Sequence, residues 1–223
     1  MKKRKFLIVV IIGLLFFCYN HLENNNNLSY ASDYNIPSTN EDGYTILNNN
    51  KSTFTSTDVV GDTYEEYSEL DSLGRSGTAT ALLHKSIMPT KKRESIGSIK
   101  PSGWHTVKYS NIDGLYLYNR CHLIGYQLTG QNKNPLNLIT CTRQMNTGVM
   151  LEYENKVANY LKETNNHVLY RVTPVYEDKN LLASGVIMEA KSVEDNNLEF
   201  NIYVYNIQDG IEINYLTGES SKK

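Results

Sequence analysis

The sequence has little of what marks a membrane-spanning, repetitive or strongly charged protein. Its longest apolar run, from Phe6 to Tyr19, has 14 residues, short of the roughly 20 that a helix needs to cross a bilayer. No internal repeat is visible, and the formal net charge of −2 gives the chain as a whole no attraction for a polyanion. Cysteine occurs three times and tryptophan once among the 223 residues, of which 40% are apolar. One globular domain with appendages is therefore expected.

The N-terminus has the pattern of an export signal. Met1 to Lys5 is basic, the apolar run follows, and Ser29-Tyr30-Ala31 supplies small residues at the two positions that a signal peptidase reads. We expect residues 1–31 to be a signal peptide that is cleaved after Ala31, with an uncleaved membrane anchor as the alternative. The protein would then be secreted, or anchored at the outer face of the cell membrane.

Residues 32–66 are expected to be a disordered linker. They are rich in Asn, Ser and Thr and lack a sustained apolar period, so they would bury too little surface to offset the entropy of ordering. The pattern changes near Tyr67, and we assign residues 67–218 to the folded domain and residues 219–223 to a tail.

Charge becomes informative when it is divided along the chain. Residues 71–145 carry 10 basic and 3 acidic groups, whereas residues 32–70 carry 1 and 8, and residues 146–223 carry 7 and 12. The middle block is therefore positive inside an acidic chain, and it would attract a nucleic acid. The run Lys91-Lys92-Arg93 belongs either to that attraction or to a solvated turn.

Apolar periodicity predicts an α+β fold. Residues 114–124 and 136–142 are expected to be strands, and residues 150–161 show helical spacing. Three further strands are predicted at 167–175, 181–190 and 200–207, with a short helix at 78–88 that ends at Pro89. We expect a core of two strands and a helix, packed on an antiparallel β-sheet.

Polar residues with catalytic potential gather at the ends of the first two strands. Hydrolysis of a phosphodiester needs a base for water, a cation for the charge that grows on phosphorus, and protection of the leaving oxygen. His122 can be neutral near pH 7 and accept a proton. Asn146 offers an amide oxygen that suits Mg²⁺, an ion that keeps several waters and takes few protein ligands. Mn²⁺ is the alternative ion.

The run Asn119-Arg120-Cys121-His122 resembles the Asp-Arg-Gly-His signature of the DNA/RNA non-specific endonucleases, which are ββα-metal (His-Me finger) nucleases. The resemblance implies that His122 is the general base, with Arg120 beside it in the catalytic group, and that Asn146 binds the metal. It also implies that Asn137, nine residues before Asn146, orders the site. Glu154, eight residues after Asn146, would contact water bound to the metal.

The wider sequence resembles the exported Gram-positive branch of that family over roughly residues 67–218. The segments that carry this resemblance are Leu70–Arg75, Lys100–His105 and Asn201–Asn206.

Three positions depart from the family pattern. Asn119 replaces Asp and keeps a polar amide, and Cys121 replaces Gly and adds a Cβ. Ala158 stands where the family has a helix Arg, so leaving-group stabilisation would pass to Arg143 or Arg171.

Cys121 and Cys141 are the two cysteines that remain once the signal is removed. In an oxidising compartment an even pair invites a disulfide, and an antiparallel hairpin of the two strands would place them opposite or nearly so. A disulfide and two free thiols both remain open. His105 and His167 are interpreted as structural, and His84, in the short helix expected at 78–88, carries no signal.

We therefore predict a secreted or surface-tethered, Mg²⁺-dependent endonuclease that cuts DNA and RNA with little sequence preference. The resemblance implies a product that carries a 5′-phosphate. Two alternatives remain: a non-catalytic nucleic-acid-binding or uptake protein, and an exported nuclease toxin. No obligate protein partner is expected, and membrane contact is expected only through an uncleaved N-terminus.

Overall fold

The computed structural model describes Ile36 and residues 42–223. The signal segment and cleavage site expected at 1–31, and the first part of the expected linker, lie outside the described residues. Within the described part, no helix is both long and apolar enough to span a bilayer.

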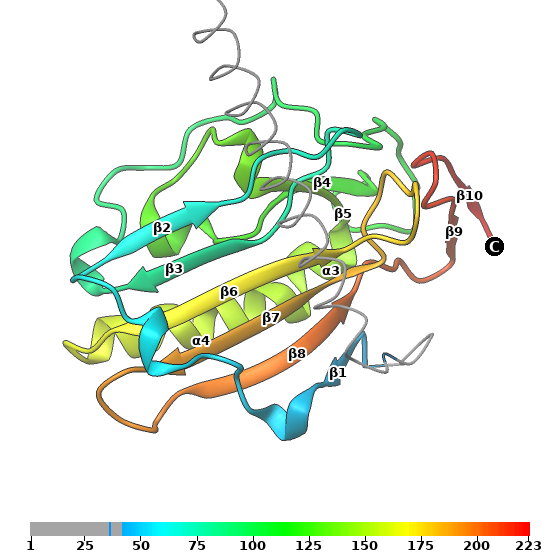
Figure 1. Ribbon diagram of the computed structural model, residues 1–223. Helices are drawn as coiled ribbons and strands as arrows, with labels where there is room; N and C mark the ends of the chain where they lie inside the picture. The colour runs from blue at the N-terminus through cyan, green and yellow to red at the C-terminus, as the bar shows by residue number, and fades with distance from the viewer. Residues whose placement is uncertain (1–35, 37–41) are drawn as a thin grey trace, which may run out of the picture. The chain divides into compact units, whose positions relative to one another are not determined.

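A six-stranded antiparallel sheet forms the centre of the fold (Figure 1), in the order β1-β8-β7-β6-β3-β2. The antiparallel sheet predicted from the sequence is confirmed, because its three central strands coincide with the three apolar runs of the C-terminal half. The strand bounds are β1 Tyr44–Ile46, β2 Tyr64–Tyr67, β3 Ala79–Leu83, β6 Val168–Val175, β7 Gly185–Ser192 and β8 Glu199–Tyr205.

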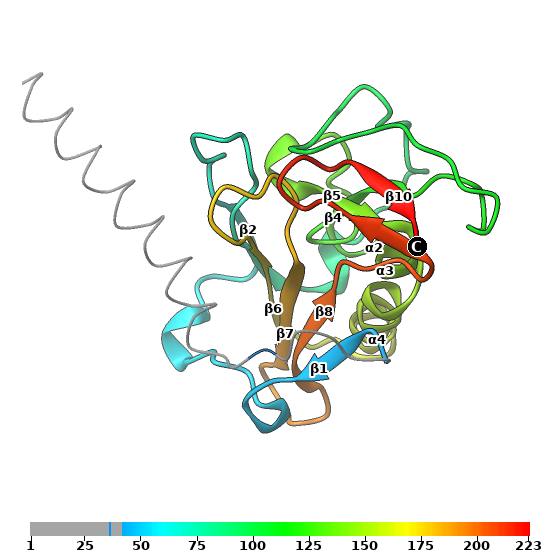
Figure 2. The same ribbon diagram turned by 90° about the vertical axis from the view of Figure 1, so that its right-hand side faces the viewer.

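Helix α4, Val149–Glu163, covers one face of the sheet (Figure 2). Its buried residues Met150, Tyr153, Val157 and Leu161 recur every three or four positions, so they form one stripe that faces the core. This stripe packs with strand residues of β3, β6, β7 and β8 in a single apolar cluster. The helix predicted at 150–161 is therefore confirmed.

The helix predicted at residues 78–88 is wrong. Residues Ala79–Leu83 form strand β3, which pairs with β6 on one side and β2 on the other, and a short 3₁₀ turn, η3, Lys85–Ile87, follows. Alanine and leucine favour helix in isolation, but two neighbouring strands supply hydrogen-bond partners and burial that outweigh this local preference.

The linker predicted at residues 32–66 is also wrong in its described second part. Strand β1 pairs with β8, and Phe54 packs with Leu82 and Leu169 on the sheet face opposite α4. Figure 2 shows this segment crossing that side of the sheet.

Carboxylates hold this polar segment in place. Glu189 accepts a hydrogen bond from the Thr53 backbone N–H at 2.7 Å, and Glu199 forms an ion pair with Lys51 at 2.8 Å. Two short 3₁₀ turns complete the segment, η1 Asn48–Asn50 and η2 Ser56–Asp58. An apolar-period test cannot detect such docking, because its contacts are mainly polar.

A separate hairpin carries the signature residues. Strand β4, Tyr118–His122, pairs antiparallel with β5, Leu138–Thr142, so that Tyr118 faces Thr142 and His122 faces Leu138. The connection contains α2, Tyr126–Thr129, and the 3₁₀ turn η4, Pro135–Asn137. Helix α3, Arg143–Thr147, begins directly after β5, and the Thr142 hydroxyl accepts from the Met145 N–H as its N-cap. The predicted succession of strand, loop, strand and helix is therefore present.

The tail predicted at residues 219–223 is wrong as well. Strand β10, Ser220–Lys222, pairs with β9, Ile211–Ile213. This C-terminal hairpin packs through Ile211 into a second apolar cluster with Ile112, Leu117 and Leu182.

A disulfide joins Cys121 of β4 to Cys141 of β5, with 5.9 Å between the Cα atoms. Cys121 faces Ile139 and Cys141 faces Asn119 in the register, so the two cysteines are diagonal neighbours on the buried side of the hairpin. The bond therefore ties the strand that ends in His122 to the strand that leads into α3.

Reduction of this disulfide is expected to lower the free energy of unfolding by about 3 kcal/mol, the loop-entropy value for a closure of this size. The measurement is denaturant unfolding of wild-type protein refolded with and without reductant, so that both samples have the same sequence. Equal unfolding midpoints would contradict the expectation.

Candidate active site

His122 ends strand β4 and is held through both ring nitrogens. It is 6% exposed. Its Nε2 lies 2.9 Å from the backbone oxygen of Asn132, and its Nδ1 lies 3.3 Å from Nη2 of Arg93. A carbonyl oxygen only accepts and a guanidinium only donates. Nε2 therefore carries the proton, and Nδ1 is the nitrogen able to accept one from water.

Burial lowers the pKa of His122 from its ordinary 6.5 to about 4, the Asn132 hydrogen bond raises it, and the charge of Arg93 lowers it. A base whose pKa is lowered stays neutral down to more acidic solution. His122 is therefore a neutral imidazole across the neutral range.

The acid limb of nuclease activity due to His122 is expected near pH 4 instead of near 6.5. Because the pKa is depressed, the neutral imidazole persists above about pH 4 and is lost as pH falls through that value. The measurement is kcat/KM against pH at saturating metal ion. An acid limb centred near pH 6.5 would show that the imidazole is not shielded as the structure has it.

Asn137 supports the turn that follows His122. Its Oδ1 accepts from the N–H of Ile124 at 2.8 Å, and its Nδ2 donates to the oxygen of the same residue at 3.0 Å. The side chain is fully buried, so these two bonds hold the backbone two residues beyond the imidazole. This geometry supports an ordering role for Asn137.

Arg120 shares the face of β4 that carries His122, but it is committed to a neighbouring loop. Its Nη2 donates to the backbone oxygen of Gly97 at 2.8 Å, its Nε donates to that of Ile99, and its guanidinium lies 3.9 Å from the centre of the Trp104 ring. These contacts favour a positioning role over the direct catalytic role that the signature predicted.

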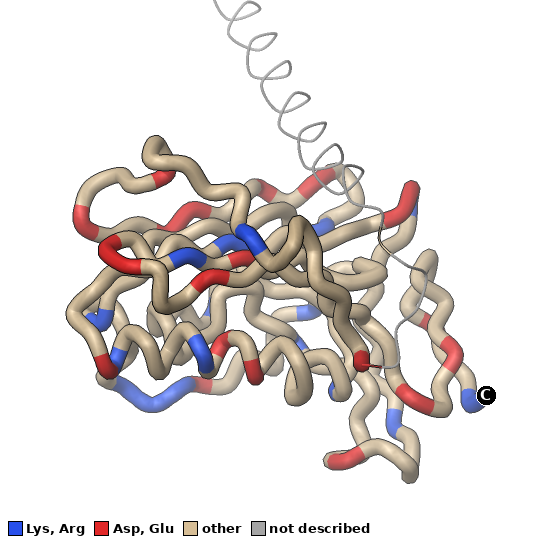
Figure 3. Tube along the Cα trace, turned by 90° about the horizontal axis from the view of Figure 1, so that it is seen from below, with Lys and Arg blue, Asp and Glu red and all other residues tan. Residues whose placement is uncertain are grey.

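We call residues 91–99, which Arg120 holds, the basic loop. Its Lys91-Lys92-Arg93 run forms a continuous positive stretch of the chain (Figure 3). Tyr126 donates to the oxygen of Lys91 at 2.8 Å, and Nδ2 of Asn132 donates to the oxygen of Glu94 at 3.2 Å. The loop is therefore anchored at several backbone positions, and Asn132 contacts both the loop and His122.

Glu154 of α4 lies beside the loop that follows β4. An ideal Cβ at position 125 would be only 2.7 Å from its Oε2, so a larger residue there would displace the carboxylate. Burial raises the pKa of Glu154 to about 8, and the charge of Arg93 and a hydrogen bond from Gln127 lower it. The same guanidinium thus acts on both Glu154 and His122.

Asn146 lies on α3, which packs against β4 and β5. Asn146 is partly exposed. It is not a helix N-cap, because Thr142 is the N-cap residue of α3 and Gly148 is that of α4. Among the described residues no group of three or more His, Cys, Asp or Glu side chains could hold a metal ion. Asn146 on α3 and Glu154 on α4 each carry hard oxygen donors, and donors of this kind in small number suit Mg²⁺ better than Ca²⁺ or a structural Zn²⁺.

The two arginines proposed for the leaving group are each paired with carboxylates. Arg143, directly after β5, pairs with Asp113 at 3.0 Å. Arg171 of β6 pairs with Glu189 at 2.9 Å and Asp58 at 3.3 Å, beneath the N-terminal segment.

Asn119, the signature residue that replaces Asp, has a buried Nδ2 with no hydrogen-bond partner among the described residues. The structure gives no account of its role.

The other described histidines have structural partners. The rings of His84 and His167 stack with 4.6 Å between centroids, His167 pairs with Glu194 at 2.6 Å, and His105 lies 3.1 Å from the Thr217 oxygen. These contacts agree with the structural role predicted for His105 and His167.

Sequence reasoning missed two residues of the His122 environment, Arg93 and Asn132. Arg93 had a weak signal as part of a three-residue basic run. Asn132 had none, because its contact with the imidazole uses a backbone oxygen.

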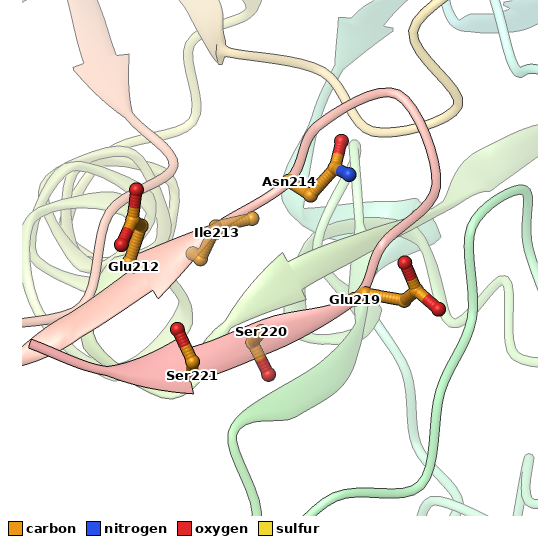
Figure 4. Close-up of a pocket in the computed structure, with 6 residues that line it drawn as sticks. All are labelled: Glu212, Ile213, Asn214, Glu219, Ser220 and Ser221. Atoms are coloured by element: carbon orange, nitrogen blue, oxygen red, sulfur yellow. The ribbon is translucent and has the colours of Figure 1, made fainter.

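A surface hollow lies at the C-terminal hairpin (Figure 4) and is lined by Glu212, Ile213, Asn214, Glu219, Ser220 and Ser221. Its two carboxylates would repel a phosphate backbone. The hollow is therefore a poor nucleic-acid site compared with the region around His122 and the basic loop.

Comparison with known proteins identifies the family of this chain. The family described as DNA/RNA non-specific endonuclease matches residues 53–194. NucA from Streptococcus agalactiae, solved with a magnesium ion bound, is 32% identical with a TM-score of 0.76, and the match covers 90% of this chain and 96% of that one. The Sda1 nuclease, solved with a bound zinc ion, is 26% identical with a TM-score of 0.68 over 82% of this chain and 97% of that one.

A curated relative, a deoxyribonuclease of Streptococcus dysgalactiae subsp. equisimilis, is 32% identical over 108 residues, which are 46% of this chain. The match spans 32% of that relative's length. Because the family match covers most of the folded domain and includes the β4-β5 hairpin and α4, the chain belongs to the DNA/RNA non-specific endonuclease family and has its ββα-metal fold.

Proposed function

We propose that this protein is an exported endonuclease that hydrolyses DNA and RNA with His122 as general base and one Mg²⁺ ion. The observation that carries the proposal is the fixed tautomer of His122. The Asn132 oxygen holds the proton on Nε2, which leaves Nδ1 as the proton acceptor at the edge of a positively charged loop.

The residues of this chain divide the chemistry among them. The basic loop attracts the phosphate backbone, and Asn137 and Arg120 keep the imidazole and the loop in place. His122 Nδ1 accepts a proton from water as the water oxygen bonds to phosphorus. The bond from phosphorus to the 3′-oxygen breaks, that oxygen takes a proton from solvent, and the product keeps a 5′-phosphate.

Asn146, with Glu154 nearby in sequence on the following helix, would hold the metal ion. The bound ion supplies positive charge that stabilises the transition state and the leaving oxygen. Magnesium is bound to NucA and zinc to Sda1 in the solved relatives. We choose Mg²⁺ because the residues here offer oxygen donors, with Mn²⁺ as a substitute of similar preference.

Little sequence preference follows if most contacts are made to phosphates, which carry no base information. The same argument extends the substrate from DNA to RNA, since both present a phosphodiester backbone. The positive block at residues 71–145 contains the basic loop and the signature hairpin, and it supports this choice of substrate.

Export is proposed from the N-terminal pattern, with residues 1–31 as signal or anchor, so that the enzyme acts outside the cell or at its surface. A nuclease toxin would use the same chemistry for another purpose. The rival of a different class is a binding or uptake protein that has lost turnover.

The test is digestion of plasmid DNA and of a structured RNA by purified protein, with added Mg²⁺, with chelator, and with Mg²⁺ restored. We expect both substrates to be cleaved, cleavage to stop with chelator, and products to carry 5′-phosphates. Binding without cleavage would favour the non-catalytic rival. Cleavage of DNA alone would remove RNA from the proposal.

A further inference from the structure

The nitrogen that must accept the proton is already occupied in this structure. Nδ1 of His122 receives a hydrogen bond from Nη2 of Arg93 at 3.3 Å, while Nε2 is bound to Asn132. A water molecule cannot use the lone pair on Nδ1 while the guanidinium points at it. The structure therefore shows a base whose reactive nitrogen is covered.

The covering contact is weak compared with the one that a substrate would offer. A guanidinium that donates to a neutral imidazole makes a single long bond, whereas a phosphate oxygen accepts shorter, charge-assisted bonds from the same group, often two at once. A phosphodiester that enters the site would therefore compete well for Arg93.

The backbone around Arg93 permits such an exchange without movement of the whole loop. The loop is anchored on either side of Arg93 through the backbone oxygens of Lys91 and Glu94. The Arg93 side chain is exposed, and it is long and has several rotatable bonds. The guanidinium can turn away from His122 while the loop stays in place.

We propose that Arg93 is a substrate-operated cap on His122: it covers Nδ1 in the free protein and moves to the substrate phosphate on binding, which uncovers the base. This inference rests on the proposed function of His122 as general base. It makes Arg93 a substrate-binding residue whose contact with the imidazole ends when the phosphate binds.

The cap has a second consequence for the free protein. Arg93 is the charged group that acts on His122, and Glu154 of α4 is affected by the same guanidinium. The positive charge disfavours an imidazolium beside it. Burial is the main cause of the lowered pKa of His122, and the charge of the cap adds to it, so the base of the free enzyme stays unprotonated.

The test follows the imidazole directly, by ¹⁵N NMR of histidine-labelled protein with chelator present so that no turnover occurs. His122 is assigned by comparison with the His122→Gln variant. The probes are inorganic phosphate and then a short single-stranded DNA. We expect the ¹⁵N shift of Nδ1 to move toward that of an unbonded acceptor nitrogen as either probe binds, while Nε2 stays protonated.

Arg93→Gln removes the guanidinium, and Lys92→Gln is the matched control, because it removes one positive charge from the same loop. The structure gives Lys92 no hydrogen bond or ion pair among the described residues. We expect Arg93→Gln to show the uncapped Nδ1 shift without any probe, to raise the pKa of His122 measured by NMR titration, and to reduce kcat/KM. Lys92→Gln should keep the capped shift and its response to phosphate.

Either of two NMR results would overturn the cap: an Nδ1 shift in wild type that does not change when the probes bind, or an Arg93→Gln protein whose free Nδ1 shift equals that of wild type. Faster cleavage by Arg93→Gln than by wild type would also overturn it, since the guanidinium would then only obstruct the base. If wild type fails to cleave any substrate, the proposed function is lost, yet the NMR comparison still decides whether phosphate displaces Arg93.

Discussion

The His122→Ala variant is expected to lose about 10²–10⁴-fold in kcat/KM for plasmid cleavage, the usual contribution of a general base. The hydrogen bond from Nε2 of His122 to the Asn132 oxygen leaves Nδ1 of the same ring as the proton acceptor. Alanine removes that acceptor but leaves the basic loop and Asn146, so DNA binding should persist. The measurement is steady-state cleavage, with binding followed by fluorescence anisotropy in chelator.

His105→Ala is the matched control, because it removes an exposed imidazole whose contact is with the Thr217 oxygen. It should cleave at the wild-type rate. Thermal unfolding of both variants checks that each is folded. Full activity in a folded His122→Ala protein would remove His122 from the mechanism and with it the central argument for the site.

The Asn146→Ala variant is expected to need a metal-ion concentration roughly 100-fold higher for half-maximal rate, and to lose activity at lower concentration. Loss of supporting residues around a metal typically costs 10–100-fold in affinity or activity, and a direct ligand should cost at least the upper value. Few protein donors would remain to compensate, since the described residues contain no larger metal-binding cluster. The measurements are cleavage rate against Mg²⁺ and direct Mn²⁺ binding without substrate.

Asn159→Ala supplies the comparison, because Asn159 is an exposed asparagine on α4. Its Mg²⁺ dependence should match that of wild type. Asn146→Asp keeps an oxygen donor and should retain more metal affinity than Asn146→Ala. If Asn146→Ala binds Mn²⁺ as tightly as wild type, the ion is held elsewhere.

Much of the central unit was predictable because its signals are local. The apolar runs of β4, β5, β6, β7 and β8 and the stripe of α4 each appear within one short window of sequence. The spacing from His122 to Asn146 and Glu154 then follows from a hairpin and a helix in succession. Runs rich in strongly β-forming residues and a segment with one apolar stripe at helical spacing leave little doubt about which secondary structure each segment forms.

The errors share one cause, which is that the deciding contacts are distant in sequence. Residues 79–83 became a strand because β2 and β6 lie on either side, and residues 220–222 became a strand because β9 lies opposite. The segment from Gly43 to Tyr67 joined the fold through carboxylates of β7 and β8. No window of local sequence contains those partners.

Cys121, at the glycine position of the family signature, shows what the sequence predicts and what only the fold decides. From sequence, a Cβ at the glycine position of the signature put the local geometry in question. The hairpin register instead turns the side chain to the buried face, where it meets Cys141. The substitution thus adds a covalent tie beside His122 without placing its side chain on the face that carries the imidazole.

By itself, the amino-acid sequence determined the family and the hairpin-and-helix core and pointed to His122 as the proposed base, because each is encoded in residue types a few positions apart. Only the tertiary structure decided which nitrogen of His122 can accept a proton, that Arg120 holds a loop, and that Arg93 covers the base. Those facts depend on the directions of hydrogen bonds between segments some 10 to 30 residues apart, and chain folding alone sets such directions.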